Sequence, residues 1–162
     1  MSARVSSGDG TATVATGIPV LDHLLTLLAR SGRFQLNLEL PPGDAEAEVA
    51  DAGRALGEAV RDLLRAEDAR GHGSAFVPAD EALAQVALEV SGRPLVASNV
   101  DLTEARAGGL RRDLAASFLD ALARSAGLTL HVRLIEGEDS QHVLEAIFKA
   151  LGAALAQDSR AR

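Results

Sequence analysis

The sequence predicts an α+β fold made of two copies of one half, with helices packed on one face of a mixed or antiparallel sheet. The segment Leu28-Ala29-Arg30-Ser31 recurs 94 residues later as Leu122-Ala123-Arg124-Ser125, and each copy precedes a run of alternating apolar residues. Further along, segment 54–60 is echoed by segment 149–155, at an offset of 95 residues. Because both matches keep the same order, we predict a single domain over 1–162 whose repeated halves span about 11–66 and 100–158.

Apolar periodicity predicts a helix, a strand and a second helix in the first half. Pro19 suits the first turn of a helix, and leucines at three-to-four spacing continue this helix over 19–30, before Ser31-Gly32 ends it. Residues 34–40 alternate as a strand does. After a break at Pro41-Pro42-Gly43, apolar residues at helical spacing predict a long helix. They are Val49, Ala52, Leu56, Val60, Leu63 and Leu64.

The second half repeats this order after two additional strands. Alternation predicts strands over 82–90 and 94–100, on either side of the turn Ser91-Gly92-Arg93-Pro94. A helix over 112–124, a strand over 128–134 and a helix over 140–157 follow.

Composition excludes several classes of function. The 162 residues are 47% hydrophobic, which is enough for a core, and no apolar run is long enough to span a membrane. The absence of cysteine excludes disulfides, zinc-thiolate sites and thiol nucleophiles. A net charge of -7 and 2% aromatic residues argue against binding to nucleic acid. We therefore expect a soluble, cytoplasmic protein.

Two short segments contain residues that could bind a metal. His23 follows Asp22 early in the first helix, where a lone histidine is either a ligand or a packed or capping residue. Gln141-His142-x-x-Glu145 stands at a helix start, and the spacing predicts that His142 and Glu145 share one face. Such a pair holds divalent metals in helical proteins, but surface helices also carry it.

Two basic side chains could bind an anion. Arg93 lies in a predicted turn, and Lys149, the one lysine of the chain, lies on the same predicted helix as His142. Each either holds a phosphate or carboxylate or extends into solvent.

Five segments, in their order and spacing, closely resemble imidazoleglycerol-phosphate dehydratase of histidine biosynthesis. They are Thr16-Gly17-Ile18-Pro19-Val20-Leu21-Asp22-His23-Leu24-Leu25, Pro78-Ala79-Asp80-Glu81-Ala82-Leu83, Ser91-Gly92-Arg93-Pro94, Gly127-Leu128-Thr129-Leu130-His131-Val132 and Glu145-Ala146-Ile147-Phe148-Lys149-Ala150. The resemblance extends over residues 11–157. It implies a duplicated α+β subunit that forms trimers and then a 24-subunit shell, with dimanganese sites between subunits and no organic cofactor.

The same resemblance identifies metal-ligand positions that this sequence has changed. The family has a His-His-x-x-Glu motif at the start of the first long helix, and the aligned positions here are Glu46, Ala47 and Ala50. In the second copy of the motif Gln141 replaces a histidine, and Ser117 replaces a histidine of the preceding helix. The residual family ligands are His23, His142 and Glu145.

The resemblance also assigns roles to the other candidates. Arg93 and Lys149 match phosphate-binding positions, and Glu145 is the carboxylate that would move protons if the chain is active. The family has an N-terminal strand with a substrate-contacting Glu and a C-terminal Ser-Ser-Lys tail, and we expect both to be missing here.

The altered ligands suggest a loss of catalysis. Alanine offers no donor electron pair, glutamine is a poor ligand, and Glu46 is a hard oxygen donor. Dehydration in the family needs metal ions that hold the imidazole ring as an electron sink. We therefore expect a non-catalytic or strongly impaired homologue that forms a homo-oligomer or assembles with an active subunit, and that retains a pocket for a phosphate ester. The alternatives are an authentic but divergent dehydratase and an unrelated binding or scaffold module.

Overall fold

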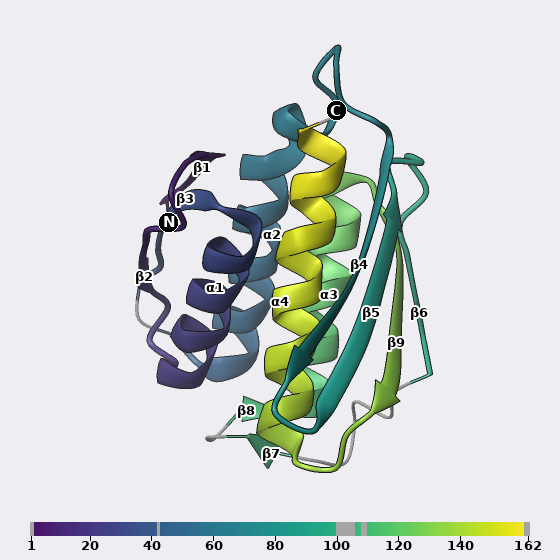
Figure 1. Cartoon of the computed structure of the whole chain (residues 1–162). Coiled ribbons are helices and arrows are strands. Elements are labelled where there is room, and N and C mark those ends of the chain that lie inside the picture. Colours follow the sequence, from purple (N-terminus) through teal and green to yellow (C-terminus); the bar gives the residue numbers. More distant parts are fainter. Residues whose placement is uncertain (1, 42, 100–105, 108–109, 161–162) are drawn as a thin grey trace.

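The computed structural model describes residues 2–41, 43–99, 106–107 and 110–160. The chain contains β1 (Ser2–Ser7), β2 (Ala12–Ala15), α1 (Pro19–Gly32), β3 (Phe34–Glu39), α2 (Ala45–Leu64), β4 (His72–Ala79), β5 (Ala82–Glu89), β6 (Leu95–Ser98), β7 (Arg106–Ala107), β8 (Leu110–Arg111), α3 (Arg112–Ala126), β9 (Thr129–Glu136) and α4 (Ser140–Ser159). Four helices form two middle layers, and a sheet covers each outer side (Figure 1). The helices pack α1 against α4 and α2 against α3.

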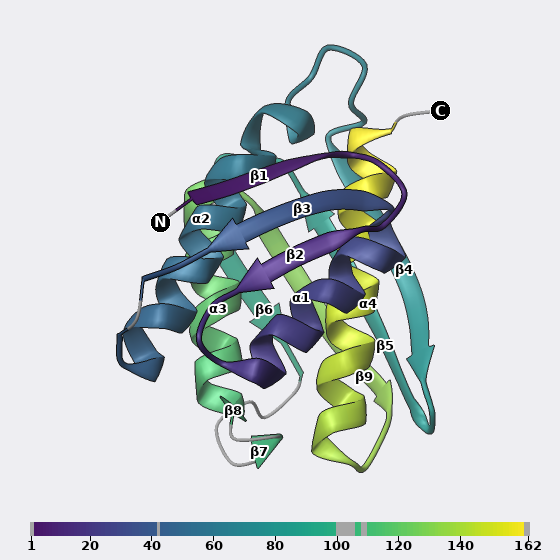
Figure 2. The ribbon, with the colours of Figure 1, turned by 90° about the vertical axis from the view of Figure 1, so that its left-hand side faces the viewer.

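The strand order of the two sheets repeats. In the first sheet β3 lies between β1, which is antiparallel to it, and β2, which is parallel to it (Figure 2). In the second sheet β9 lies between the antiparallel β5 and the parallel β6, and β4 forms the edge beside β5. The predicted α+β class with duplication is therefore confirmed. Each mixed sheet carries helices on one face, but there are two such sheets where we expected one.

The long helices α2 and α4 are related residue by residue, at the offset of 95 that the sequence predicts. Both begin after an aspartate N-cap: the Asp44 carboxylate accepts from the Ala47 amide, and the Asp139 carboxylate accepts from two amides of α4. Both also have a glycine at the contact with the partner helix. A Cβ at Gly57 would lie 3.0 Å from a carbonyl oxygen of α3, and one at Gly152 would overlap the matching carbonyl oxygen of α1.

Five strands of the described chain lie outside the sequence prediction: β1, β2, β4 and the two-residue strands β7 and β8. The edge strand β4 contains Gly73 and Pro78, which obscure its alternation, and proline is tolerated at a sheet edge because it lacks the N–H that a central strand must donate. The short β2 consists mostly of small residues. Ser2–Ser7 forms β1, which pairs with β3 and contains no Glu, so the expectation about the family's Glu-bearing strand stays a prediction.

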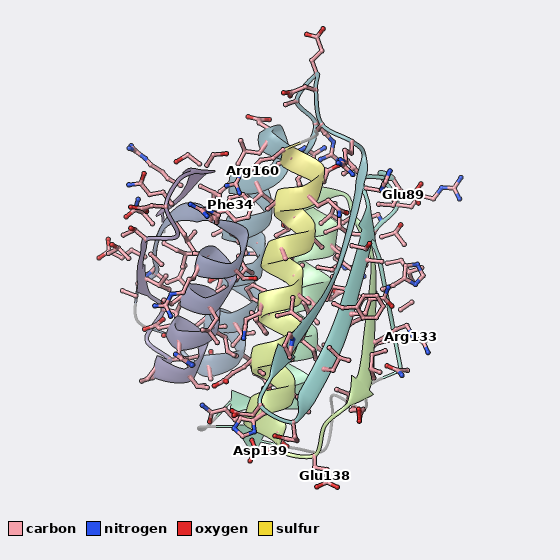
Figure 3. The ribbon with its side chains drawn as sticks, in the orientation of Figure 1. Phe34, Glu89, Arg133, Glu138, Asp139 and Arg160 are labelled. Carbon is pink, nitrogen blue, oxygen red and sulfur yellow. The ribbon has the colours of Figure 1, made fainter. Side chains whose placement is uncertain are left out.

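The core lies between the helical layers and the inner faces of the sheets, and its largest buried side chains include Phe34, Phe118 and Phe148. The Arg160 guanidinium joins the end of α4 to the corner between α1 and β3. It donates to the carbonyl oxygens of Gly32 and Arg33 and lies 5.0 Å from the centre of the Phe34 ring (Figure 3). Within the described residues, every helix is too short or too polar to span a membrane.

Candidate functional site

The first cluster of predicted site residues forms where α1 packs beside the start of α4. His23 Nε2 lies 3.2 Å from Glu145 Oε2, and the Gln141 side-chain amide donates to the same oxygen at 3.2 Å. Half of the His23 side chain is exposed, against 19% of Glu145. The structure thus brings together His23 and Glu145, two candidate ligands that are 122 residues apart in the chain. We call His23, Gln141 and Glu145 the α1/α4 site.

Asp22 fixes the segment that leads to His23. Its carboxylate accepts from both the amide and the hydroxyl of Thr16, at 2.9 and 2.5 Å. The loop before α1 is thereby attached to the helix's first turn, where an acidic residue is also favoured by the helix dipole. The two residues therefore have different contacts: Asp22 attaches the preceding loop to the start of α1, and His23 contacts Glu145 of α4.

His142 contacts a different element from the one that Glu145 contacts. Its Nδ1 is 2.7 Å from Glu81 Oε1 and its Nε2 is 3.3 Å from Asp80 Oδ2, both in the two-residue turn between β4 and β5. His142 and Glu145 therefore contact different elements of the chain, the β4–β5 turn and α1. Gln141, four residues from Glu145, occupies the position beside that carboxylate.

Hydrogen bonds shift the pKa values of this second pair in opposite directions. The Glu81 carboxylate accepts from the backbone amide of Asp139 and from His142, and these bonds lower the pKa of Glu81 to about 2. The hydrogen bond to Glu81 raises the pKa of His142, with a further contribution from the charge of Asp139. Asp139 lies at the start of α4, in the lower part of Figure 3. The pair fastens α4 to the β4–β5 turn.

The repeat relates the α1/α4 site to a groove between α2 and α3. The positions equivalent to His23 and Glu145 are Ser117 and Ala50, and both line an open groove of about 550 Å³. Arg54, Glu58, Asp120 and Arg124 also line it. Glu46 and Ala47, which are exposed in the first turn of α2, correspond to Gln141 and His142. At the positions of His23 and Glu145 one copy therefore keeps a histidine and a carboxylate, and the other has a serine and an alanine.

The side chains of one chain do not fit the metal pair that the resemblance implies. Among the described residues, no group of three or more histidine and acidic side chains is arranged to hold a metal ion. His23 and Glu145 contact each other, and both ring nitrogens of His142 face carboxylates of the β4–β5 turn.

The two predicted anion-binding residues lie toward opposite ends of the second sheet. The turn that holds Arg93 is attached to the start of β9, where Thr129 donates its hydroxyl to the Arg93 carbonyl. The Lys149 ammonium donates to the carbonyl of Pro78, at the end of the sheet where β9 finishes. A strand of this length separates the two ends by roughly 20 Å. A single chain does not bring these residues into one pocket.

Glu81 and Asp80 are the site residues that sequence reasoning did not single out. They lie in one of the segments that carry the family resemblance, but their contact with His142 depends on the hairpin formed by β4 and β5. A prediction of β4 would have placed an acidic turn at that hairpin. Asp80 there has a left-handed backbone, with φ 52°, which aspartate tolerates better than most residues.

Comparisons with known proteins agree with this fold and with the resemblance. The family model of imidazoleglycerol-phosphate dehydratase matches residues 16–155. An imidazoleglycerol-phosphate dehydratase from Moorella thermoacetica is 45% identical over 157 residues, which are 93% of this chain and 79% of that protein. One from Clostridium botulinum (strain Kyoto / Type A2) is 41% identical over 155 residues, covering 91% and 78% of the two chains.

Solved structures give the same result. The crystal structure of imidazoleglycerol-phosphate dehydratase from Staphylococcus aureus matches with a TM-score of 0.86 and 32% identity, over 95% of this chain and 90% of that chain. The enzyme from Pyrococcus furiosus, in complex with (S)-C348, matches with a TM-score of 0.85 and 31% identity, over 97% and 88%. Sequence and structure together establish that this chain belongs to the imidazoleglycerol-phosphate dehydratase family.

Proposed function

We propose that the chain is an imidazoleglycerol-phosphate dehydratase homologue of histidine biosynthesis that is non-catalytic or strongly impaired. The observation that carries the proposal is the asymmetry between the two copies of the site. The α1/α4 site keeps a histidine and a carboxylate, whereas the groove between α2 and α3 presents Ser117 and Ala50 at the equivalent positions. Serine and alanine are poor replacements for the imidazole and carboxylate ligands that divalent metals need.

Assembly into a homo-oligomer does not replace the lost ligands. In a symmetric assembly every subunit offers the same side chains, so the ligands per metal equal the ligands per chain divided by the metals per chain. With His23, His142 and Glu145 as residual ligands, two metal ions per chain would share fewer than two family ligands each. Stable transition-metal sites in proteins use three or four.

An authentic but divergent dehydratase is the alternative, with ligands from Asp44, Glu46, His72 or a neighbouring chain. The positions of Asp44 and His72 argue against a role for either residue as a metal ligand. The Asp44 carboxylate caps α2, and His72 lies at the start of β4, beside the end of α4. Glu46 is exposed in the first turn of α2 and remains the best candidate for a replacement ligand.

Elemental analysis of the purified protein and a dehydration assay with manganese test the proposal. The chain expressed alone with excess manganese is expected to retain well under one tightly bound metal per subunit and to show no turnover of imidazoleglycerol phosphate. Stoichiometric manganese together with measurable turnover would establish the authentic enzyme instead.

A repaired variant provides the matched control. It combines five substitutions at the changed positions: Glu46→His, Ala47→His, Ala50→Glu, Ser117→His and Gln141→His. The first three positions follow an aspartate N-cap on a regular helix, as their counterparts on α4 do, so the backbone already suits the motif. The variant is expected to bind more manganese than the parent. A folded variant that binds no more would show that these positions are wrongly aligned.

The proposal includes retained binding of a phosphate ester by Arg93 and Lys149. Because one chain holds them far apart, a joint pocket needs Arg93 and Lys149 from different subunits. A few charge-assisted contacts predict weak affinity, on the order of millimolar. Titrations of inorganic phosphate into the wild type, Arg93→Ala and Lys149→Ala should find weaker binding in both variants. Equal affinity in all three proteins would remove these residues from the site.

The same proposal concerns assembly and location. We expect a cytoplasmic homo-oligomer based on trimers, up to a 24-subunit shell, or co-assembly with an active dehydratase subunit. Mass measurement of the native assembly, alone and after co-expression with an active family member, distinguishes these states.

A further inference from the structure

Asp158, in the last turn of α4, has a fully buried side chain. Its exposed fraction is 0%, and neither carboxyl oxygen has a hydrogen-bond partner among the described residues. A buried carboxylate without hydrogen-bond donors loses its hydration, and no protein contact compensates for this loss. Such a group either binds a proton or is hydrated through local opening of the structure. The end of a helix is also unfavourable for a negative charge, because the helix dipole is negative there.

The last turn of α4 holds residues 65–74, which we call the connector and which comprise the segment between α2 and β4 together with the start of β4. The Arg70 amide donates to the Asp158 carbonyl at 3.0 Å, and the Ser74 amide donates to Gln157 Oε1 at 2.7 Å. Between these bonds Gly73 packs so tightly that a Cβ there would overlap the Ala154 carbonyl oxygen. The connector is thus held against α4 by backbone contacts on both sides of Asp158.

The charges around Asp158 do not offset its burial. Burial dominates and raises the pKa of Asp158, although the nearby Gly71 amide, which falls short of hydrogen-bond geometry, and the charges of His72 on β4 and Arg65 at the end of α2 favour the ionised form. His72 itself pairs in register with Glu89 on β5. On α4, Arg160 donates to carbonyl oxygens at the α1–β3 corner.

We propose that the last turn of α4 is a proton-dependent clamp on the connector. With the Asp158 carboxyl protonated, the turn stays buried and the Arg70 and Ser74 amides remain bonded to it. Loss of the proton leaves an unpaired charge in the core, and the turn and connector separate to admit water.

The direction of the pH effect follows from proton linkage. The folded state binds the proton more tightly than the unfolded chain, whose aspartate has an ordinary pKa of about 3.9. The stabilisation from Asp158 is therefore complete below that value and is lost as pH rises through the higher pKa of the folded state. Within that window the folding equilibrium constant changes by up to about tenfold per pH unit.

Asp158→Asn tests the clamp, because the amide is nearly isosteric and stays neutral. Asp62→Asn is the matched control: Asp62 lies in the last turn of α2, but its side chain is exposed. Chemical unfolding from pH 4 to pH 8 should show the wild type losing stability relative to Asp158→Asn as pH rises. Asp62→Asn should follow the wild type. Parallel curves for all three proteins would overturn the proposal.

Two further measurements separate the clamp from a purely local acid. Hydrogen exchange of the Arg70 and Ser74 amides, compared at each pH with Asp158→Asn, should lose protection in the wild type as pH rises. Unchanged relative protection would overturn the release of the connector. Carbon NMR titration of the Asp158 carboxyl in the wild type needs no variant, and an ordinary or lowered pKa there would refute the proposal even if Asp158→Asn fails to fold.

Discussion

Replacing Gly152 with alanine should destabilise the protein, although alanine is the better helix former. Helices α1 and α4 meet backbone to backbone at this glycine. A Cβ there would overlap the Leu28 carbonyl oxygen and lie 2.9 Å from the carbonyl carbon and 3.1 Å from Cα of the same residue. These atoms belong to the α1 backbone, so no side-chain rotation can relieve the overlap, and the helices must move apart.

The magnitude follows from two opposing contributions. Replacing glycine by alanine inside a helix stabilises the helix by up to about 1 kcal/mol. Overpacking a close-packed core costs about 1–3 kcal/mol of stability. Because the neighbour of Gly152 is rigid backbone, we expect the cost of Gly152→Ala to lie at or above the upper end of this range. The net loss is about 2 kcal/mol, which lowers Tm by roughly 4–8 °C for a domain of this size.

Gly57, the repeat-related glycine on α2, is the matched control. A Cβ there would first meet Ser125 Oγ, the end of a rotatable side chain, and then the Leu122 carbonyl oxygen at 3.0 Å. Urea unfolding should therefore show a smaller loss for Gly57→Ala than for Gly152→Ala, with unchanged m values in both. If Gly152→Ala equals the wild type, or is more stable than Gly57→Ala, the close approach of α1 and α4 is refuted.

Two other contacts give predictions of different kinds. Arg160→Ala removes donors to two carbonyls and a stack on an aromatic ring, and should cost about 2 kcal/mol in urea unfolding. Arg124→Ala, which breaks an exposed pair within one helix, should cost no more than about 0.5 kcal/mol, and equal losses would contradict the role of Arg160. Glu81→Gln should lower the pKa of His142 toward its ordinary value in an NMR titration, because the main bond that raises it becomes neutral. The stabilisation from that pair is present below the ordinary histidine pKa and is lost as pH rises through the raised one.

The sequence by itself determined the helices and the repetition. Apolar residues at helical spacing identified α1, α2, α3 and α4, because a helix buries one stripe whatever lies against it. The offset of 95 also relates the start of α2 to the start of α4 through residue identities alone. The changed ligand positions Glu46, Ala47 and Ala50 come from the resemblance to the family, aligned through Asp51, Gly53 and Ala55-Leu56-Gly57.

The tertiary structure decided which side chains meet. The spacing of His142 and Glu145 suggested one site, but the β4–β5 turn binds the first and His23 binds the second, across 61 and 122 residues. No local pattern contains such contacts, because they depend on strand pairing and on how α1 packs against α4. The unpartnered carboxyl of Asp158 is of the same kind, because the connector packs against the end of α4, where the carboxyl is buried. A sequence shows only a polar residue near a helix end.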